Sequence, residues 1–113
     1  MAVTSTSVVV VEDDPELLLS YRDAILRDEG LELRGAMPTM RAALALLARA
    51  VPDVLVVDLG LPDGNGADLI RHAVGRRSDC DVLVVTIFGD DEHLIKAIEA
   101  GATGFLLKDS PPT

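Results

Sequence analysis

Short apolar runs alternate with amphipathic segments along the chain. The runs at residues 8–11, 54–57 and 82–85 are apolar on both faces, as covered central strands of a parallel sheet must be. Glu32 and Arg34 interrupt another run, which therefore predicts an edge strand. In all, five runs predict β-strands, at residues 8–11, 31–36, 54–57, 82–85 and 104–107.

The amphipathic segments between these runs predict four helices, at residues 15–27, 39–49, 66–74 and 90–100. Asp14 followed by Pro15 is a favoured N-cap and N1 pair, and Thr39 and Asp90 can cap their helices likewise. Because crossovers between parallel strands are right-handed, the simplest fold for this order is α/β with a doubly wound parallel sheet. The site of such a sheet lies at the carboxyl ends of its strands.

Acidic residues stand where the first and third predicted strands end. Glu12, Asp13 and Asp58 should converge, because these strands are neighbours in such a sheet. Two like charges about 4 Å apart cost roughly 4 kcal/mol at an effective dielectric of 20, so the cluster must hold protons or a cation. Carboxylate oxygens with room for water suit Mg²⁺. A zinc site is not expected, since His72 and His93 lie within predicted helices.

Asp58 ends a buried strand and is the best placed of these acids to react. A carboxylate can act as a nucleophile, and phosphoryl transfer otherwise needs positioning and charge neutralisation. Lys108, after the last run, can supply a compact positive charge, and Thr86 a hydroxyl. Plain structural roles remain open for Asp14 as a helix cap, for Lys108 as a strand-end lysine and for Thr86 as a strand residue.

Composition narrows the setting. The 113 residues suffice for one domain, and with only three aromatic residues its core must be aliphatic. A formal net charge of −9 disfavours direct binding to nucleic acid or anionic lipid. The single cysteine, Cys80, suits a reducing compartment, and no signal peptide or membrane span is evident. We therefore expect a cytoplasmic protein with no membrane partner.

Four motifs stand at the ends of the predicted strands and in the loops that follow them: VVVEDD (9–14), VLVVDLGLPDGNG (54–66), VLVVT (82–86) and AGATGFLLKD (100–109). Together they resemble the receiver domain of bacterial two-component response regulators, and the match runs from about Ser7 to the last residue. Asp109 stands after Lys108 where many receivers have proline, and this ending is most similar to the NarL/LuxR-type subfamily, whose receivers precede a helix-turn-helix.

The resemblance implies a phosphorylation-dependent switch and the flavodoxin-like strand order 2-1-3-4-5. Asp58 would accept a phosphoryl group from a sensor histidine kinase, Lys108 and Thr86 would contact the phosphoryl oxygens, and Phe105 would turn inward when Thr86 moves. The resulting change would regulate an output, transcription in this subfamily. The domain would act as an enzyme only on itself, in its own phosphorylation and slow dephosphorylation.

The resemblance also implies a Mg²⁺ site. Asp13 and Asp58 would bind the ion through side chains, Gly60 through its carbonyl, and Glu12 through water. Gly60 stands where family members often carry a polar side chain that orients water, and Phe88 is bulky and apolar. Both departures predict slow self-dephosphorylation, because water lacks a side-chain guide and is partly shut out.

Other functions fit less well. A constitutive interaction module with receiver architecture would not depend on phosphate and remains the alternative. A phosphohydrolase with Asp58 as nucleophile would need an acid where Gly60 stands. Flavin or dinucleotide binding is disfavoured because Gly64-Asn-Gly66 lacks a third glycine and does not directly follow a strand.

The end of the chain affects the expected assembly. Receivers have a fifth helix after the last strand, and Ser110-Pro-Pro-Thr113 is typical of a helix start. We therefore expect residues 1–113 to form a receiver domain that ends before its final helix, with a helix-turn-helix output domain elsewhere in a longer protein. The bare aliphatic surface on the first and fifth strands should then favour a homodimer or lower the stability.

Overall fold

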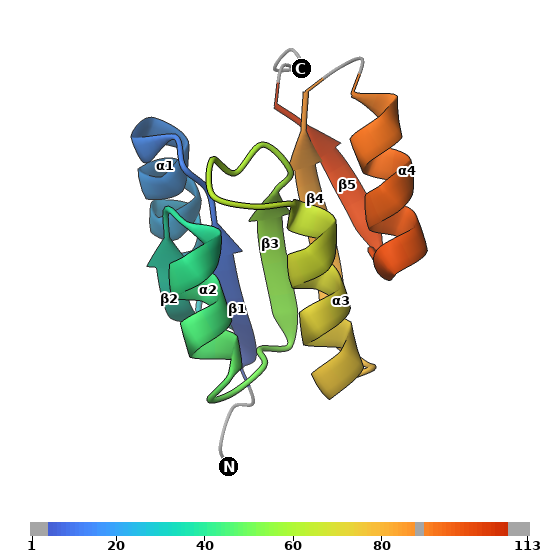
Figure 1. The fold of residues 1–113 in the computed structure, drawn as a ribbon. Helices are drawn as coiled ribbons and strands as arrows, with labels where there is room; N and C mark the ends of the chain where they lie inside the picture. Colours follow the sequence, from blue (N-terminus) through green and yellow to red (C-terminus); the bar gives the residue numbers. More distant parts are fainter. Residues whose placement is uncertain (1–4, 88–89, 109–113) are drawn as a thin grey trace.

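The computed structural model describes residues 5–87 and 90–108 and has the predicted alternation of strands and helices (Figure 1). Five parallel strands form one sheet in the order β2-β1-β3-β4-β5, which confirms the order implied by the resemblance. The elements are β1 (Thr6–Val11), α1 (Pro15–Leu26), β2 (Leu31–Met37), α2 (Met40–Leu47), β3 (Val54–Asp58), α3 (Gly66–Arg76), β4 (Asp81–Thr86), α4 (Asp91–Ala100) and β5 (Gly104–Leu107).

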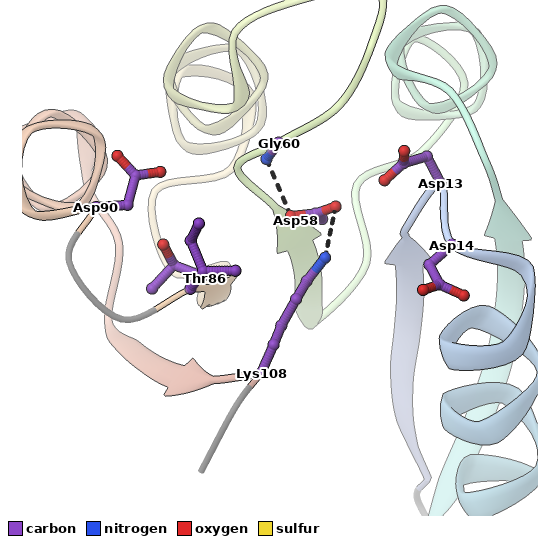
Figure 2. Close-up of a pocket in the computed structure, with 8 residues that line it drawn as sticks. Asp13, Asp14, Asp58, Gly60, Thr86, Asp90 and Lys108 are labelled. Atoms are coloured by element: carbon purple, nitrogen blue, oxygen red, sulfur yellow. Dashed lines mark hydrogen bonds and ion pairs between the residues drawn. The ribbon is translucent and has the colours of Figure 1, made fainter.

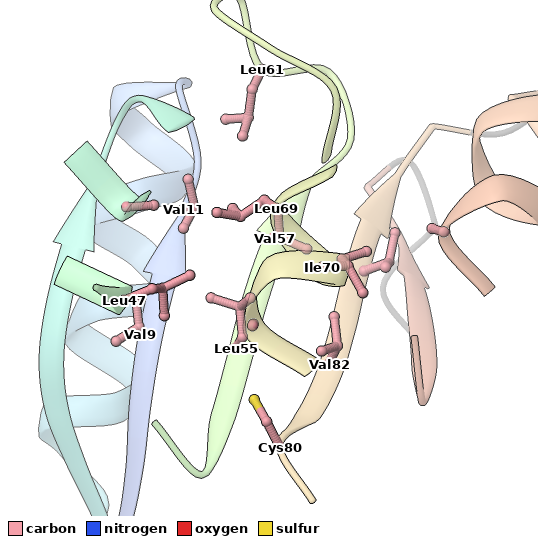
Figure 3. Packing of buried hydrophobic residues seen from close by; sticks show 14 of the residues in the cluster. Val9, Val11, Leu47, Leu55, Val57, Leu61, Leu69, Ile70, Cys80 and Val82 are labelled. Atoms are coloured by element: carbon pink, nitrogen blue, oxygen red, sulfur yellow. The ribbon is translucent and has the colours of Figure 1, made fainter. Parts of the chain in front are cut away.

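The sheet is covered unequally on its two faces. Side chains alternate along β1, so that Val9 and Val11 face α2 and α3 while Val8 and Val10 face α1. The larger cluster lies on the α2, α3 and α4 side and is built almost entirely from aliphatic side chains (Figure 3). This aliphatic core agrees with the composition. It fixes the strand positions, and thereby the places where the strands end.

The α1 face carries an open apolar groove beside α1, which is the one helix that covers this face within residues 5–87 and 90–108. Tyr21 and Ile25 of α1 form one wall. Leu106 of β5 is 52% exposed at the far side, and the groove encloses about 160 Å³. Apolar surface is thus open at β5, as expected, and the groove also runs along β3 and β4. The expectation for β1 was wrong, because α1 packs on Val8 and Val10 and buries them. Whether it drives self-association stays a prediction, and the helix start proposed at Ser110–Thr113 lies outside the described residues.

Capping side chains explain where the first three helices begin. Asp14 Oδ1 accepts hydrogen bonds from the backbone N–H groups of Glu16 and Leu17, at 3.0 and 3.4 Å. Thr39 Oγ1 accepts from the N–H of Ala42 at 3.1 Å. These two predicted caps are confirmed, and Asn65 caps α3 in the same way.

Two local details differ from the predictions. Asp90 occupies the N-cap position of α4, but its side chain makes no capping hydrogen bond and instead lies 2.5 Å from His93 Nδ1. Helix α3 continues past Val74, because one glycine at position 75 lowers helix stability by only about 1 kcal/mol and does not end a helix packed on the sheet. Among the described residues, no helix is both long and apolar enough to cross a bilayer.

Candidate functional site

The carboxyl ends of β1, β3, β4 and β5 surround one pocket of about 280 Å³. Strand β3 lies between β1 and β4, so its last residue, Asp58, is in the middle of this edge (Figure 2). The lining residues come from strand ends and from the loops that follow them: Asp13, Asp14, Asp58, Gly60, Thr86, Ile87, Asp90 and Lys108.

The predicted carboxylate cluster is present. Glu12, Asp13 and Asp58 each offer an oxygen atom, and these atoms lie within 4.8 Å of one another. Glu12 and Asp58 are buried, with exposed fractions of 1% and 3%, whereas Asp13 is exposed. The N–H of Asp14 donates a hydrogen bond to Glu12 Oε2 at 3.2 Å, which holds the Glu12 side chain at the turn after β1.

Lys108 joins the cluster from the end of β5. Its Nζ lies 2.9 Å from Asp58 Oδ2 and 3.1 Å from Glu12 Oε1, and donates a hydrogen bond to Glu12 Oε2 at 3.3 Å. The Lys108 backbone N–H donates to the carbonyl of Thr86 at 2.8 Å, so that the two strand ends are joined. One ammonium therefore faces two buried carboxylates, and the strand-end role alone does not describe this lysine.

Because one ammonium faces two carboxylates, the pKa values of the three groups shift. Burial, followed by the neighbouring Asp58 carboxylate, raises the pKa of Glu12 to about 7. Burial would also raise the pKa of Asp58, but interactions with Glu12 and then with the Gly60 N–H outweigh it and hold that pKa below its ordinary value. Burial opposes the charge of Lys108, yet Asp58 and Glu12 together raise the pKa of its ammonium. At neutral pH the site therefore holds a charged lysine, a charged Asp58 and a partly protonated Glu12.

The loop after β3 shapes the surroundings of Asp58. The Gly60 N–H donates a hydrogen bond to Asp58 Oδ1 at 2.9 Å (Figure 2). A Cβ atom at Gly60 would lie 3.6 Å from Asp58 Oδ1, which is an ordinary contact. A side chain at position 60 would therefore fit beside the Asp58 carboxylate, and this space is open because residue 60 is glycine.

Three buried oxygen atoms have no hydrogen-bond partner among the described residues. They are Glu12 Oε1, Asp58 Oδ2 and Thr86 Oγ1. Lys108 Nζ lies at ion-pair distance from the first two, while the Thr86 hydroxyl has no such neighbour. The Lys108 ammonium thus already compensates the two carboxylate oxygens. Because buried polar atoms are nearly always satisfied, the Thr86 hydroxyl is the atom that indicates a ligand at the site, an acceptor for its hydrogen.

Not every predicted residue is in the pocket, and one pocket residue was missed. Phe105 is half exposed on β5 and does not line the pocket, and Phe88 lies outside the described residues. Asp90 lines the pocket opposite Asp13 and Asp14 (Figure 2). Its position four residues after Thr86 was a usable signal, but the sequence pattern favoured a capping role. Asp14 both caps α1, as predicted, and lines the pocket.

Known proteins share both this sequence pattern and this fold. DevR/DosR of Mycobacterium tuberculosis, a DNA-binding transcriptional activator, is 36% identical over 102 residues, which cover 90% of this chain and 47% of that protein. KdpE of Escherichia coli, the KDP operon transcriptional regulatory protein, is 34% identical over 103 residues, which cover 91% and 44%. The chain thus spans about half the length of these curated relatives.

Solved structures and a family model agree. The signal receiver domain of the response regulator NarL from Mycobacterium tuberculosis has a TM-score of 0.82 at 29% identity, covering 96% of this chain and 87% of the other. A LuxR-family two-component response regulator from Aurantimonas sp. SI85-9A1 has the same score and identity and covers 96% and 78%. The model of the response regulator receiver domain matches residues 8–113. With nearly all of its residues matched, the chain belongs to the receiver-domain family of two-component response regulators, which includes regulators of transcription.

Proposed function

We propose that this chain is a phosphorylation-dependent switch in which Asp58 accepts a phosphoryl group from a phosphohistidine of a sensor histidine kinase. The observation that carries the proposal is the position of Asp58. Its carboxylate is buried at the middle of the pocket, charged, and 2.9 Å from the Lys108 ammonium. A nucleophile next to a fixed cation is what transfer of a phosphoryl group requires.

In the transfer, an oxygen of Asp58 attacks the phosphorus atom. A P–O bond forms as the P–N bond of the phosphohistidine breaks, and the electron pair of that bond leaves with the imidazole nitrogen. Lys108 neutralises charge on the phosphoryl oxygens, and the Thr86 hydroxyl donates to one of them. This use gives Thr86 Oγ1 a partner, which it lacks among the residues that the structure describes.

Mg²⁺ fits the acidic side of the pocket. Hard oxygen ligands from Asp13 and Asp58, the Gly60 carbonyl and water held by Glu12 match its preference for carboxylates, carbonyls and water. When bound, the ion supplies positive charge to the phosphoryl oxygens. Glu12 then gives up its proton, because a nearby cation favours its charged form.

The output of the switch is a change in the surface around β4 and β5. Phosphorylation adds roughly −1.5 to −2 charges at Asp58, which attracts the Thr86 hydroxyl toward the new oxygens. Movement of Thr86 leaves space that Phe105, half exposed on the neighbouring strand, fills by turning inward. Partners that read this surface then distinguish the two states.

The remaining partners follow from the relatives. DevR/DosR is a DNA-binding transcriptional activator. By analogy we assign residues 1–113 to the receiver domain of a longer cytoplasmic regulator whose output domain binds DNA and regulates transcription. The acidic receiver itself makes no direct contact with DNA, since its net charge of −9 repels phosphate.

The test is incubation with a small acyl-phosphate donor and Mg²⁺, followed by intact mass measurement. The expected result is a single phosphoryl adduct that disappears in Asp58→Asn. Asp23→Asn, on the exposed surface of α1, is the matched control and should still form the adduct. No adduct under saturating donor, with the fold intact, would favour a constitutive interaction module.

A further inference from the structure

Asp63, in the loop between β3 and α3, contacts a helix that the proposed chemistry does not use. Its Oδ1 accepts a hydrogen bond from the backbone N–H of Met40 at 2.8 Å, and its Oδ2 accepts one from the N–H of Arg41 at 3.0 Å. Both donors belong to the first turn of α2. The loop that carries Gly60 is therefore tied to a helix 22–23 residues earlier in the chain.

These bonds complete the capping of α2. Thr39, the helix's own cap, satisfies only the N–H of Ala42, which leaves the N–H groups of Met40 and Arg41 for Asp63. A carboxylate is favoured there by the positive end of the helix dipole. The two backbone hydrogen bonds, first that from Arg41, hold the pKa of Asp63 below its ordinary value, so the clamp is charged at neutral pH.

The same loop is anchored on both sides of Asp63. Leu59 and Leu61 are buried, with exposed fractions of 7% and 6%, and the Leu59 N–H donates to the carbonyl of Val85 at 3.2 Å. After Asp63, Gly64 lies against the Met40 side chain so closely that a Cβ atom there would overlap the sulfur. Met40 thus meets the loop through both its backbone and its side chain.

Gly60 lies between these anchors. Its N–H is fixed on Asp58 Oδ1 at 2.9 Å, and no side chain of its own restrains it. Its peptide position therefore depends on how the rest of the loop is held. Leu59 and Leu61 fix the loop's depth in the core, but burial is not directional. The hydrogen bonds of Asp63 are directional and fix the loop against α2.

We propose that Asp63 is a positioning residue for the phosphoacceptor site, which acts by clamping the β3–α3 loop to the first turn of α2 and so placing the Gly60 peptide. The inference rests on the proposed function, because Gly60 matters there through its carbonyl toward Mg²⁺ and its N–H toward Asp58. Loss of the clamp lets the loop shift, and Mg²⁺ then binds more weakly although Asp13 and Asp58 are unchanged.

The test compares Asp63→Asn with Thr39→Ala. Both changes weaken the capping of the same helix. Asp63→Asn keeps one acceptor oxygen but places an NH2 group against the second backbone N–H, so at least one of the two bonds between loop and helix is lost, whereas Thr39→Ala leaves both intact. The Mg²⁺ concentration that gives half the maximal phosphorylation rate should rise roughly tenfold in Asp63→Asn, the lower end of the effect of removing a group that orients metal ligands. This Mg²⁺ concentration should stay unchanged in Thr39→Ala. Saturating Mg²⁺ should restore the phosphorylation rate of Asp63→Asn.

A second measurement does not require phosphorylation. In the metal-free protein, the Gly60 amide should lose protection from hydrogen exchange in Asp63→Asn and keep it in Thr39→Ala. If both variants lower the melting temperature alike and neither changes the Gly60 amide or the Mg²⁺ dependence, Asp63 is only a helix cap and the inference is wrong. If the wild-type chain forms no adduct, the proposed function fails, and the Gly60 amide alone decides the role of Asp63.

Discussion

The Lys108 ammonium lies 2.9 Å from Asp58 Oδ2 and 3.1 Å from Glu12 Oε1, at the end of the strand next to the one that carries Thr86. One cation thus neutralises two buried carboxylates, one at the end of β3 and one directly after β1. Its position is set by the backbone bond from Lys108 N–H to the Thr86 carbonyl.

Replacement of this lysine should impair phosphoryl transfer. In Lys108→Met the phosphoryl oxygens lose their fixed positive charge, and the pKa of Asp58 rises because the carboxylate loses a cation partner. We expect the rate of adduct formation to fall about 100-fold, as when one preorganised donor is removed from a transition-state site. The control is Lys96→Met. Lys96 is the other lysine of the chain and forms an exposed ion pair with Glu92, so its replacement should leave the rate of adduct formation unchanged.

Binding of Mg²⁺ should release a proton from Glu12. The pKa of this buried group is about 7, above its ordinary value of 4.5, so near pH 6 most molecules of the metal-free protein carry the proton. Because the folded state binds this proton more tightly than the unfolded state, the contribution of Glu12 to the free energy of unfolding is most favourable below pH 4.5. This contribution is lost as the pH rises through about 7. Calorimetry in buffers of different ionisation enthalpy should detect close to one released proton at pH 6 and little at pH 8.5.

Glu12→Gln is the decisive comparison for this release. The amide has no proton to lose in this range, so Mg²⁺ binding at pH 6 should release none. Glu99→Gln, at the exposed end of α4, should behave like the wild-type protein. A release that persists in Glu12→Gln would mean that another group carries the proton.

At the opposite end of the sheet, Asp53 should make the free energy of unfolding fall as the pH is lowered into the acid range. Its carboxylate accepts hydrogen bonds from the Ser7 N–H at 2.8 Å and from Arg77 Nη2 at 2.6 Å. These bonds, first that from the Ser7 backbone, lower the pKa of Asp53 from 3.8 to about 2. Its contribution is therefore complete above pH 3.8 and is lost as the pH falls toward 2.

Thermal unfolding checks this dependence. Asp53→Asn should lower the melting temperature at pH 7, and the difference from the wild-type protein should shrink as the pH approaches 2. Asp79→Asn removes a more exposed partner of the same arginine and should change the melting temperature little. An equal loss at pH 7 and pH 2 in Asp53→Asn would show that its charge does not matter.

A polar side chain at position 60 should shorten the life of the phosphorylated state. Gly60 offers no group to orient water, and a Cβ atom there would meet Asp58 only at ordinary contact distance. We expect Gly60→Asn to speed loss of the adduct about tenfold, since orienting an attacking water is a large part of hydrolytic catalysis. Gly60→Ala adds bulk without a polar group and should not speed the loss. Similar decay in both variants would show that water orientation is not limiting.

The apolar groove beside α1 should support weak self-association. Leu106 is 52% exposed in the groove, and exposed apolar patches tend to find partners. Sedimentation at increasing concentration should show a dimer that Leu106→Asn weakens. Leu19→Asn, on a half-exposed leucine that does not line the groove, should leave it unchanged. A wild-type monomer at high concentration would contradict this prediction.

The sequence predicted most of the fold because its central strands are continuous apolar runs and because caps such as Asp14 are local. The cluster of Glu12, Asp13 and Asp58 was predictable for a similar reason, since strand ends in a parallel sheet share one edge. These inferences need only short-range pattern and a topological rule.

The missed features depend on contacts between distant segments. Nothing near Asp63 in the sequence indicates that it caps α2, and nothing near Asp53 indicates Arg77 as its partner. Asp90 stands at the predicted N-cap position, but its local sequence does not indicate that its carboxylate faces His93 and the pocket in place of the helix N–H groups.

The missing side-chain cap of α4 has a mechanical consequence. A shift in the first turn of α1, α2 or α3 breaks capping hydrogen bonds, and losing a cap costs about 1 kcal/mol. Helix α4 holds no such bond at Asp90, so its first turn can rearrange without this loss. That turn begins five residues beyond Thr86. We therefore expect it to move more readily than the first turns of α1, α2 and α3 when charge is added at Asp58.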